Sequence, residues 1–448
     1  MTGMASVPNT RSQRRPVSGG SLLSLRAASL LGMLARQSPA FWAVSVYLFF
    51  EYVRPQTVYP ALDVLPLAKI SIILGTLLVL AEGRMRFAAQ SLWLGLVVFA
   101  GVLLASSFAA VYPQASWDAM PVWINWLMLI FVVGAGIRTH TELLLLLLQW
   151  VLWNLKMSQH GARAWVGNGF SFDAWGVSGA PGWFQNSGEF GIEMCVFLPI
   201  ACALTYGAWT NLTKWRRVIA LGIIFSVLAS VIATSSRGAF LGVAVIAVWI
   251  ALRSQYRMRI GLAALTFVSV LWLLLPEGNK ARWRSAGSDK DSVARLTYWK
   301  HGIEITNAYP LLGIGYNNWL TYYRSKYNPK GEVPHNYLVE AGSQMGYSGL
   351  VAFAIMTGLY FRANSRSRKL TGRHSANPDR MLWSLSHGLD GAMIGFLSSG
   401  FFVTVLFYPY YWMNLALALA LSRVIEGRSN PKRNGIRKHV NQTQHALV

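Results

Sequence analysis

Apolar runs of about 20 residues, long enough for a helix to cross a hydrocarbon layer about 30 Å thick, recur along this chain. Inside lipid, the backbone polar groups of a segment must be hydrogen-bonded within it, so runs of this kind form helices. Only 13% of the 448 residues are charged, about half the fraction typical of a soluble domain. The sequence therefore predicts an all-α polytopic membrane protein.

About twelve candidate spans follow one another, and one long polar segment separates the ninth from the tenth. The spans are expected at residues 40–53, 64–82, 88–110, 119–137, 140–157, 187–208, 218–235, 238–252, 260–275, 346–361, 381–402 and 405–422. The predicted organisation is an N-terminal tail at 1–38 with a short surface helix, spans 1–9 at 39–275, a large helical loop at 276–345, spans 10–12 at 346–422, and a basic tail at 423–448.

Lysines and arginines predict the orientation of these spans. With the N-terminus in the cytoplasm, 26 of the 40 Lys and Arg residues fall in cytoplasmic segments. Nine of the others lie in the long loop, where the positive-inside rule has little force, so the comparison outside that loop is 26 against 5. We expect both termini in the cytoplasm and the large loop on the external side.

The same distribution accounts for the net charge of +23. The excess of basic residues on the cytoplasmic side sets the topology and meets anionic membrane lipids, so nucleic acid is not predicted as a partner. P-loop, HExxH, CxxC and GxSxG signatures are absent from the sequence, which therefore predicts no ATP use, zinc site or serine-hydrolase site. Asp289-Lys290-Asp291 has the letters of a DxD metal site, but one such tripeptide in a polar loop is a weak signal.

Arg237 stands in the sequence ATSSRGAF, at the predicted external end of two adjacent spans. A guanidinium at a membrane boundary is costly without a partner, which makes it a functional candidate. Gly238 permits close approach of the backbone to a phosphate, and Ser235 and Ser236 offer hydrogen-bond donors. The alternative is an interfacial arginine that snorkels to lipid phosphates.

Arg295 lies in the sequence SDKDSVARLTYWKHGIEI, which predicts a helix of about 17 residues with Ser288 as its N-cap and acids in its first turn. Arg295 and Trp299 are four residues apart and share a face of this helix. The alternative is a solvated helix in which Arg295 pairs with Asp291, also four residues away. His301 is either a second functional group or part of that solvated helix.

His335 follows Pro334, which suits the first position of a helix, so the histidine is expected in the first helical turn. There the positive end of the helix dipole disfavours the imidazolium. A histidine that is neutral near pH 7 is a competent general base, and the alternative is an ordinary loop histidine. Glu189 and Glu193 lie four residues apart at the external start of the sixth span; of two roles, positioning a hydroxyl or pairing with arginines, we favour pairing.

In combination, these elements resemble the O-antigen ligase and polymerase superfamily. They are an SRGA arginine between two spans (Ser236 to Ala239), R-x-x-x-W (Arg295 and Trp299), P-x-x-G-x-G (Pro310 to Gly315), and HN at the start of a helix (His335-Asn336) with Gly342 and Gly346 after it. Their order, external placement and twelve-span topology agree with the superfamily over most of residues 40–425. The stretch FFEYVRPQ (Phe49 to Gln56) is similar to the O-glycosylation ligase branch.

The resemblance implies a glycosyltransferase at the periplasmic face of the bacterial inner membrane, acting without a cofactor or metal ion. It implies a glycan donor on undecaprenyl diphosphate and, for a ligase, a sugar hydroxyl of lipid A–core as acceptor. Arg237 and Arg295 are then the candidates for binding the leaving diphosphate. His335 would accept the proton of the attacking hydroxyl, and in-line attack predicts inversion at the anomeric carbon. Candidates for supporting roles are Asn336, Trp299, His301 and Glu189.

Alternatives stay open at this point. Within the superfamily, an O-antigen polymerase passes the glycan to another lipid-linked glycan, and a protein O-oligosaccharyltransferase uses protein hydroxyls. A lipid or glycan transporter would favour charges inside the spans and broken helices at the midplane, whereas the polar residues here gather outside the spans. The sequence leaves open the identity of the glycan, the oligomeric state, and the roles of Arg54, Lys69, Arg138 and Arg163.

Overall fold

The computed structural model describes residues 27–83, 85–170, 176–254, 256–274, 277, 280, 284, 285 and 287–429. Every regular element among these residues is a helix, which confirms the predicted all-α class. The elements are α2 (Ala27–Leu34), α3 (Pro39–Tyr52), α4 (Pro55–Val58), η1 (Pro60–Leu62), α5 (Leu67–Ala81), α6 (Gln90–Phe108), α7 (Pro113–Phe131), η2 (Val132–Gly136), α8 (His140–Gly167), α9 (Ser187–Ala208), η3 (Trp209–Asn211), α10 (Lys214–Ala233), α11 (Arg237–Arg253), α12 (Arg257–Leu274), α14 (Lys290–Ala308), α15 (Trp319–Lys326), α16 (Tyr337–Thr371), α17 (Arg380–Ser399), η4 (Gly400–Phe402) and α18 (Pro409–Ser429).

Each of the twelve predicted spans coincides with a long helix of the bundle. Five helical segments of the described chain are long and apolar enough to cross a membrane, which supports a multi-pass membrane protein. They are Pro60–Ala81, Gln90–Phe108, Pro113–Gly136, Ser187–Asn211 and Lys214–Ala233. The number of twelve spans stays a prediction. The short N-terminal helix expected near the start of the chain corresponds to α2, while residues 1–26 and 430–448 lie outside the described part.

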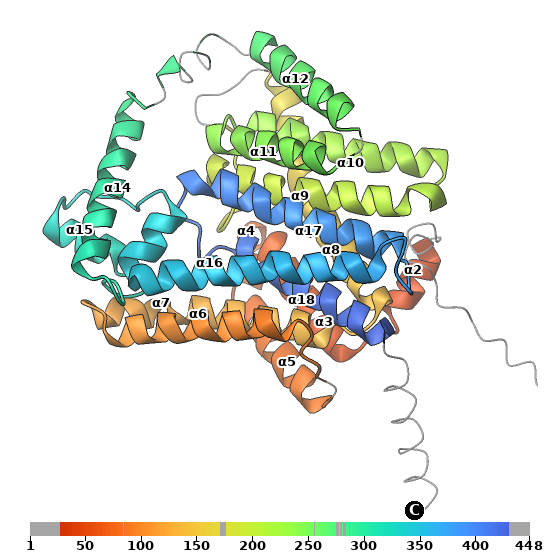
Figure 1. The fold of residues 1–448 in the computed structure, drawn as a ribbon, viewed down its shortest axis with the longest axis horizontal. Helices are drawn as coiled ribbons and strands as arrows, with labels where there is room; N and C mark the ends of the chain where they lie inside the picture. The colour runs from red at the N-terminus through yellow and green to blue at the C-terminus, as the bar shows by residue number, and fades with distance from the viewer. Residues whose placement is uncertain are drawn as a thin grey trace, which may run out of the picture.

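The long helices run roughly side by side along the longest axis of the molecule (Figure 1). Helix α17 packs along α9, and small residues allow this close approach, since a Cβ added at Gly388 would lie 2.5 Å from the Cβ of Ala203. Helix α16 packs beside α6, α8 beside α10, and α3 beside α5. Helix α18 lies inside the bundle, and its residues from Tyr410 to Leu421 are all buried.

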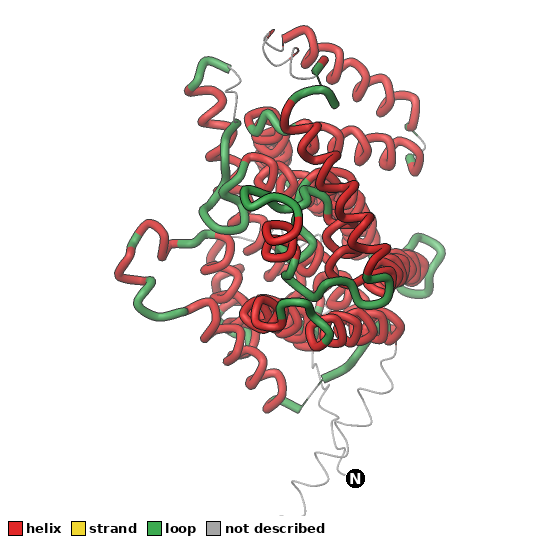
Figure 2. Tube along the Cα trace, turned by 90° about the vertical axis from the view of Figure 1, so that its left-hand side faces the viewer, coloured by secondary structure: helices red, strands yellow, loops and turns green. Residues whose placement is uncertain are grey.

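The predicted 276–345 loop contributes α14 and α15, which lie together at one end of the bundle (Figure 1). Viewed from that end, connecting segments cover the ends of the long helices (Figure 2). Several hydrogen bonds tie this region to the turn between α6 and α7 and to the start of α7, and two of them are typical. The N–H of Val111 donates to the carbonyl oxygen of Ile314 at 2.9 Å, and the Ser116 hydroxyl donates to that of Tyr316 at 2.6 Å.

The glycines of the P-x-x-G-x-G motif serve packing against a kink in α16. The kink lies at Gly346, where φ is 67° and ψ is −167°. The N–H of Tyr347 donates to the carbonyl oxygen of Pro310 at 2.8 Å, so the motif lies directly against the kink. A Cβ at Gly313, whose φ is 65°, would lie 2.3 Å from the carbonyl carbon of Gln344. Glycine is therefore needed here both for its backbone conformation and for space.

Candidate active site

A cavity of about 2330 Å³ lies where α14 and the segment before α16 meet the ends of α9, α10 and α11. Five of the seven residues predicted for the site line it, and they come from four separate stretches of the chain. They are Glu189, Arg237, Arg295, Trp299 and His335. The other two, Asn336 and His301, lie outside its lining.

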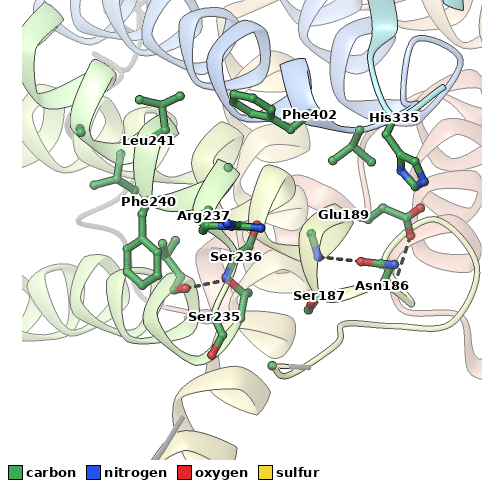
Figure 3. Close-up of a pocket in the computed structure, with 18 of the residues that line it drawn as sticks. Asn186, Ser187, Glu189, Ser235, Ser236, Arg237, Phe240, Leu241, His335 and Phe402 are labelled. Atoms are coloured by element: carbon green, nitrogen blue, oxygen red, sulfur yellow. Dashed lines mark hydrogen bonds between the residues drawn. The ribbon is translucent and has the colours of Figure 1, made fainter. Parts of the chain in front are cut away.

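Arg237 is the first residue of α11, and its position depends on tight packing of that helix. The Ser236 hydroxyl caps the helix by accepting from the N–H of Ala239 at 3.4 Å. A Cβ at Gly238 would lie 3.0 Å from the carbonyl oxygen of Ser399, so this glycine lets α11 approach the end of α17. Figure 3 shows the Arg237 side chain extending into the cavity, with His335 and Glu189 on the facing side.

The Arg237 guanidinium forms an ion pair with Asp289, the residue that precedes α14. Its Nη1 lies 3.4 Å from the carboxylate Oδ2, and about a quarter of each side chain is exposed. Asp289 is also the N-cap of α14, since it accepts from the N–H of Ser292 at 3.0 Å. The expected cap at Ser288 is therefore wrong by one residue. Hydrogen bonds from Ser292, with Arg237 nearby, lower the pKa of Asp289 to about 2.

Arg295 shares the cavity with Arg237, and the two cations disfavour each other. Burial lowers the pKa of Arg295, and the positive charge of Arg237 lowers it further. Asp291 does not form the ion pair with Arg295 that the solvated-helix interpretation requires, within the part of the chain that the structure describes. The cavity thus holds two guanidinium groups whose charges repel each other, an arrangement that an anion between them would stabilise.

His335 is placed differently from the prediction. The helix does not start at Pro334, because the Asn336 side chain caps α16 by accepting from the N–H groups of Leu338 and Val339 at 2.7 and 3.1 Å. His335 is the residue before this N-cap, and its φ of 50° lies in the left-handed region. Such a conformation is costly for a histidine and persists only where the surroundings hold it.

Two hydrogen bonds hold the strained turn from both sides. The N–H of His335 donates to the hydroxyl of Thr404 at 2.8 Å, and the indole N–H of Trp299 donates to the carbonyl oxygen of Pro334 at 3.0 Å. The Trp299 ring in turn packs edge-on against Phe401, with centroids 5.6 Å apart. Trp299 therefore supports the histidine turn from α14, while Arg295 lies one helical turn away on the same face.

The His335 imidazole is partly buried beside charges of both signs. Its Nε2 lies 3.6 Å from Oε2 of Glu332, and 24% of the side chain is exposed. Burial lowers its pKa, Arg295 lowers it further, and Glu332 opposes this shift. The net direction favours the neutral imidazole near pH 7, as predicted. The cause differs from the prediction, which attributed the neutral form to a helix dipole. Burial and Arg295 lower the pKa of His335 instead.

Glu189 lines the cavity but forms no ion pair with any arginine that the structure describes. Its carboxylate accepts from the N–H of Asn186 at 3.2 Å in a capping box at the start of α9. Glu193, one turn further, is buried in the bundle outside the cavity lining, and it forms no ion pair within the described part of the chain. The arginine pairing favoured for these two residues is therefore wrong for the described residues.

His301 joins an aromatic cluster on the outer side of α14. Its Nδ1 lies 2.8 Å from the Tyr323 hydroxyl, and its ring stacks on Tyr327 with centroids 4.1 Å apart. The four basic residues left open by the sequence also lie outside the cavity lining: Arg54, Lys69, Arg138 and Arg163. Arg138, for example, forms an ion pair with Glu82.

Among the lining residues that the sequence interpretation missed, two contact the segments around His335. Thr404 follows η4 and carries no motif, and only the fold brings it to His335. Glu340 lies one turn into α16, and its Oε2 accepts from the N–H of Leu406 at 3.2 Å, which ties the same connecting segment to α16. Glu340 could have been found from its position four residues after Asn336, which places it one turn along the same helix.

The cavity continues as an apolar arm along the bundle. Its lining there comes from facing sides of α10, α11 and α12 and includes Leu228, Leu241, Val248, Leu252 and Leu265. Arg237 lies at one end of α11 and Arg257, at the start of α12, lies by the other. The site thus has two parts. One is a basic chamber lined by Arg237, Arg295 and His335, and the other is the apolar arm, which follows α11 for most of its length.

Comparison with known families bears on this region directly. The family model described as O-Antigen ligase matches residues 221–354. The matched segment contains Arg237, Arg295, Trp299 and His335, and it spans α11, α14 and the start of α16. This match confirms the predicted resemblance and supports a glycosyltransferase-like function of the O-antigen ligase and polymerase type. No curated protein matches the chain.

Proposed function

Because residues 221–354 match the family model described as O-Antigen ligase, we propose that this chain is a ligase-type glycosyltransferase. It moves a glycan from undecaprenyl diphosphate to a hydroxyl of lipid A–core, with inversion and without a metal ion. The observation that carries this proposal is the presence of two guanidinium groups and a partly buried neutral histidine in one cavity. Two guanidinium groups facing a base suit transfer from a diphosphate donor, because the cations stabilise the leaving group and the base accepts the proton of the attacking hydroxyl.

The arginines would bind the diphosphate. As the glycosidic bond breaks, its electron pair passes to the diphosphate oxygen, and the charge that develops there requires stabilisation. Arg237 and Arg295 are permanently charged and donate paired hydrogen bonds to phosphate oxygens. The N-terminus of the 17-residue helix α11 adds its dipole at Arg237. An anion between the two groups would also relieve their mutual repulsion.

His335 would act as the general base. The acceptor hydroxyl attacks the anomeric carbon from the side opposite the diphosphate, which inverts that carbon, and its proton passes to the neutral imidazole. The Glu332 carboxylate, 3.6 Å from Nε2, would stabilise the imidazolium that forms. The strained backbone at His335 keeps the imidazole at the cavity wall, and Thr404 and Trp299 hold that backbone.

The apolar arm between α10, α11 and α12 fits the polyprenyl tail of the donor. A diphosphate at Arg237 lies at the mouth of that arm, so the tail would extend among the helices while the sugar projects toward His335. The distribution of Lys and Arg favours cytoplasmic termini. We therefore propose an inner-membrane protein whose basic chamber opens to the periplasm.

A transfer reaction with purified protein, lipid-linked donor and isolated lipid A–core tests the proposal. The expected product is glycan-substituted lipid A–core, formed equally with and without a chelator. Loss of activity with the chelator would contradict leaving-group stabilisation by arginines alone. Formation of a lengthened lipid-linked glycan, with unmodified lipid A–core, would assign the chain to the polymerases, and transfer to protein hydroxyls would assign it to the protein O-oligosaccharyltransferases.

A further inference from the structure

A second cavity, of about 550 Å³, lies at the end of the bundle away from the candidate active site. Its lining comes from the start of α6, the later part of α16 and the last turns of α18. Helix α16 begins beside His335, and Arg366 lies 29 residues along it from Tyr337, which corresponds to roughly 40 Å of helix. This cavity is therefore separate from the site described above.

The N-terminus of α6 opens into this cavity without a cap. Ala89, the N-cap residue, has a φ of 50° and supplies no side-chain hydrogen bond to the 19-residue helix. The first backbone N–H groups of a helix lack partners within it, and together with the helix dipole they favour an anion. Gln90 and Ser91, the first two residues of α6, both line the cavity.

A buried hydroxyl on the opposite wall also lacks a partner. Ser422 is 5% exposed, and its Oγ forms no hydrogen bond with any described residue. A buried hydroxyl without a partner costs free energy, so this group indicates a polar ligand in the cavity. A phosphate oxygen would accept a hydrogen bond from this hydroxyl and from the N–H groups of α6.

The charges in the cavity sum to one excess positive charge. Arg366 pairs with Glu426 at 3.8 Å, whereas Arg362, one turn earlier on α16, forms no ion pair within the described part of the chain. Beyond the cavity lining, α6 presents exposed apolar residues: Leu94 and Val97, on the same face as Gln90, are 63% and 64% exposed. A charged chamber thus adjoins an apolar surface suited to acyl chains.

We propose that this cavity binds the phosphate of an anionic phospholipid headgroup, through the α6 N-terminus, Arg362 and Ser422. The apolar surface of α6 holds the acyl chains and distinguishes a lipid from free phosphate. The excess positive charge favours a net anionic headgroup over a zwitterionic one. The proposal is independent of the glycosyl transfer proposed above.

Native mass spectrometry of the purified full-length chain, titrated with phosphatidylglycerol, tests this site. Arg362→Gln is expected to weaken lipid binding about fivefold, since one arginine near a membrane surface contributes about a factor of that size. Lys369→Gln is the matched control, because it removes one exposed charge from the same helix outside the cavity lining. Ser422→Ala is expected to weaken binding about threefold. Equal affinity of the wild type and Arg362→Gln would overturn the proposal.

Two further titrations of the wild type identify the source of the phosphate. Phosphatidylcholine is expected to bind several-fold more weakly than phosphatidylglycerol, and equal binding would overturn the proposed preference for an anionic headgroup. Millimolar inorganic phosphate is expected to leave bound phosphatidylglycerol in place, because it makes no contact with the apolar surface of α6. If phosphate displaces the lipid from the wild type but not from Arg362→Gln, the cavity binds free phosphate, and the lipid assignment is overturned.

Discussion

The indole N–H of Trp299 donates to the carbonyl oxygen of Pro334, 3.0 Å away, and so connects α14 to the turn that carries His335. Arg295 lies on the same face of α14 as Trp299, one turn earlier. One helix thus positions a cation and supports the base. The first prediction follows from this hydrogen bond.

Trp299→Phe should lower the transfer rate while the protein stays folded. The phenyl ring keeps the packing against Phe401, but the hydrogen bond to Pro334 is lost. A neutral hydrogen bond of this kind corresponds to roughly a three- to tenfold change in rate. Steady-state transfer assays measure the effect, and Trp215→Phe, on the exposed side of α10, is the control. An unchanged rate would remove Trp299 from the support of His335.

Asp289→Asn should lower the KM for the lipid-linked donor. The carboxylate of Asp289 competes with the diphosphate for Arg237, and asparagine removes that charge while keeping N-cap ability. An exposed ion pair of this kind corresponds to roughly a two- to fivefold effect. Glu304→Gln, on the same helix outside the cavity lining, is the control. A higher KM in Asp289→Asn would mean that Asp289 positions Arg237 for the donor instead.

Glu332→Gln should move the acid limb of the pH–rate profile to lower pH. The base acts in its neutral form, so activity falls as the pH drops through the pKa of His335. Glu332 raises that pKa against the lowering effects of burial and Arg295, and its removal therefore lowers the pKa further. The measurement is kcat/KM against pH for both proteins. A shift toward higher pH would contradict this assignment of charges.

Gly346→Ala should destabilise the protein. The backbone at Gly346 lies in a region open only to glycine, and an added Cβ would meet the Leu311 backbone at 2.6 Å. The conformational strain alone corresponds to about 1–3 kcal/mol. Thermal unfolding in detergent measures the loss, and Gly358→Ala on the same helix, where a Cβ meets nothing within 4 Å, should have no such effect. Equal stability of the two variants would refute the structural role of the kink.

The positions of the helices were predictable because each long apolar run has one stable conformation in lipid. The residue that caps each helix was harder to predict, because neighbouring residues compete for the N-cap position. Pro334 suits a helix start, yet Asn336 forms the cap two residues later, and this leaves His335 in a left-handed turn. At α14 the better hydrogen-bond acceptor, Asp289, likewise replaced Ser288 as the cap.

Contacts between distant segments could not be read from local patterns. The Arg237 to Asp289 ion pair joins residues 52 positions apart, and Thr404 meets His335 from 69 positions away. Motif order indicated that Arg237, Arg295 and His335 act together, but the spacing of residues within one helix carries no information about such pairs. The pairing favoured for Glu189 failed for a local reason instead, since its carboxylate accepts from the backbone at the start of its own helix in a capping box.

Glycan transfer by a His335 variant tests the central claim most directly. His335→Asn is the most informative change, because asparagine tolerates the left-handed backbone but cannot act as the base. His335→Ala is its companion. With normal folding and membrane insertion, both variants should lose roughly 100-fold or more of the transfer rate to lipid A–core. Near-normal transfer by a folded His335→Asn protein would contradict the assignment of His335 as the general base.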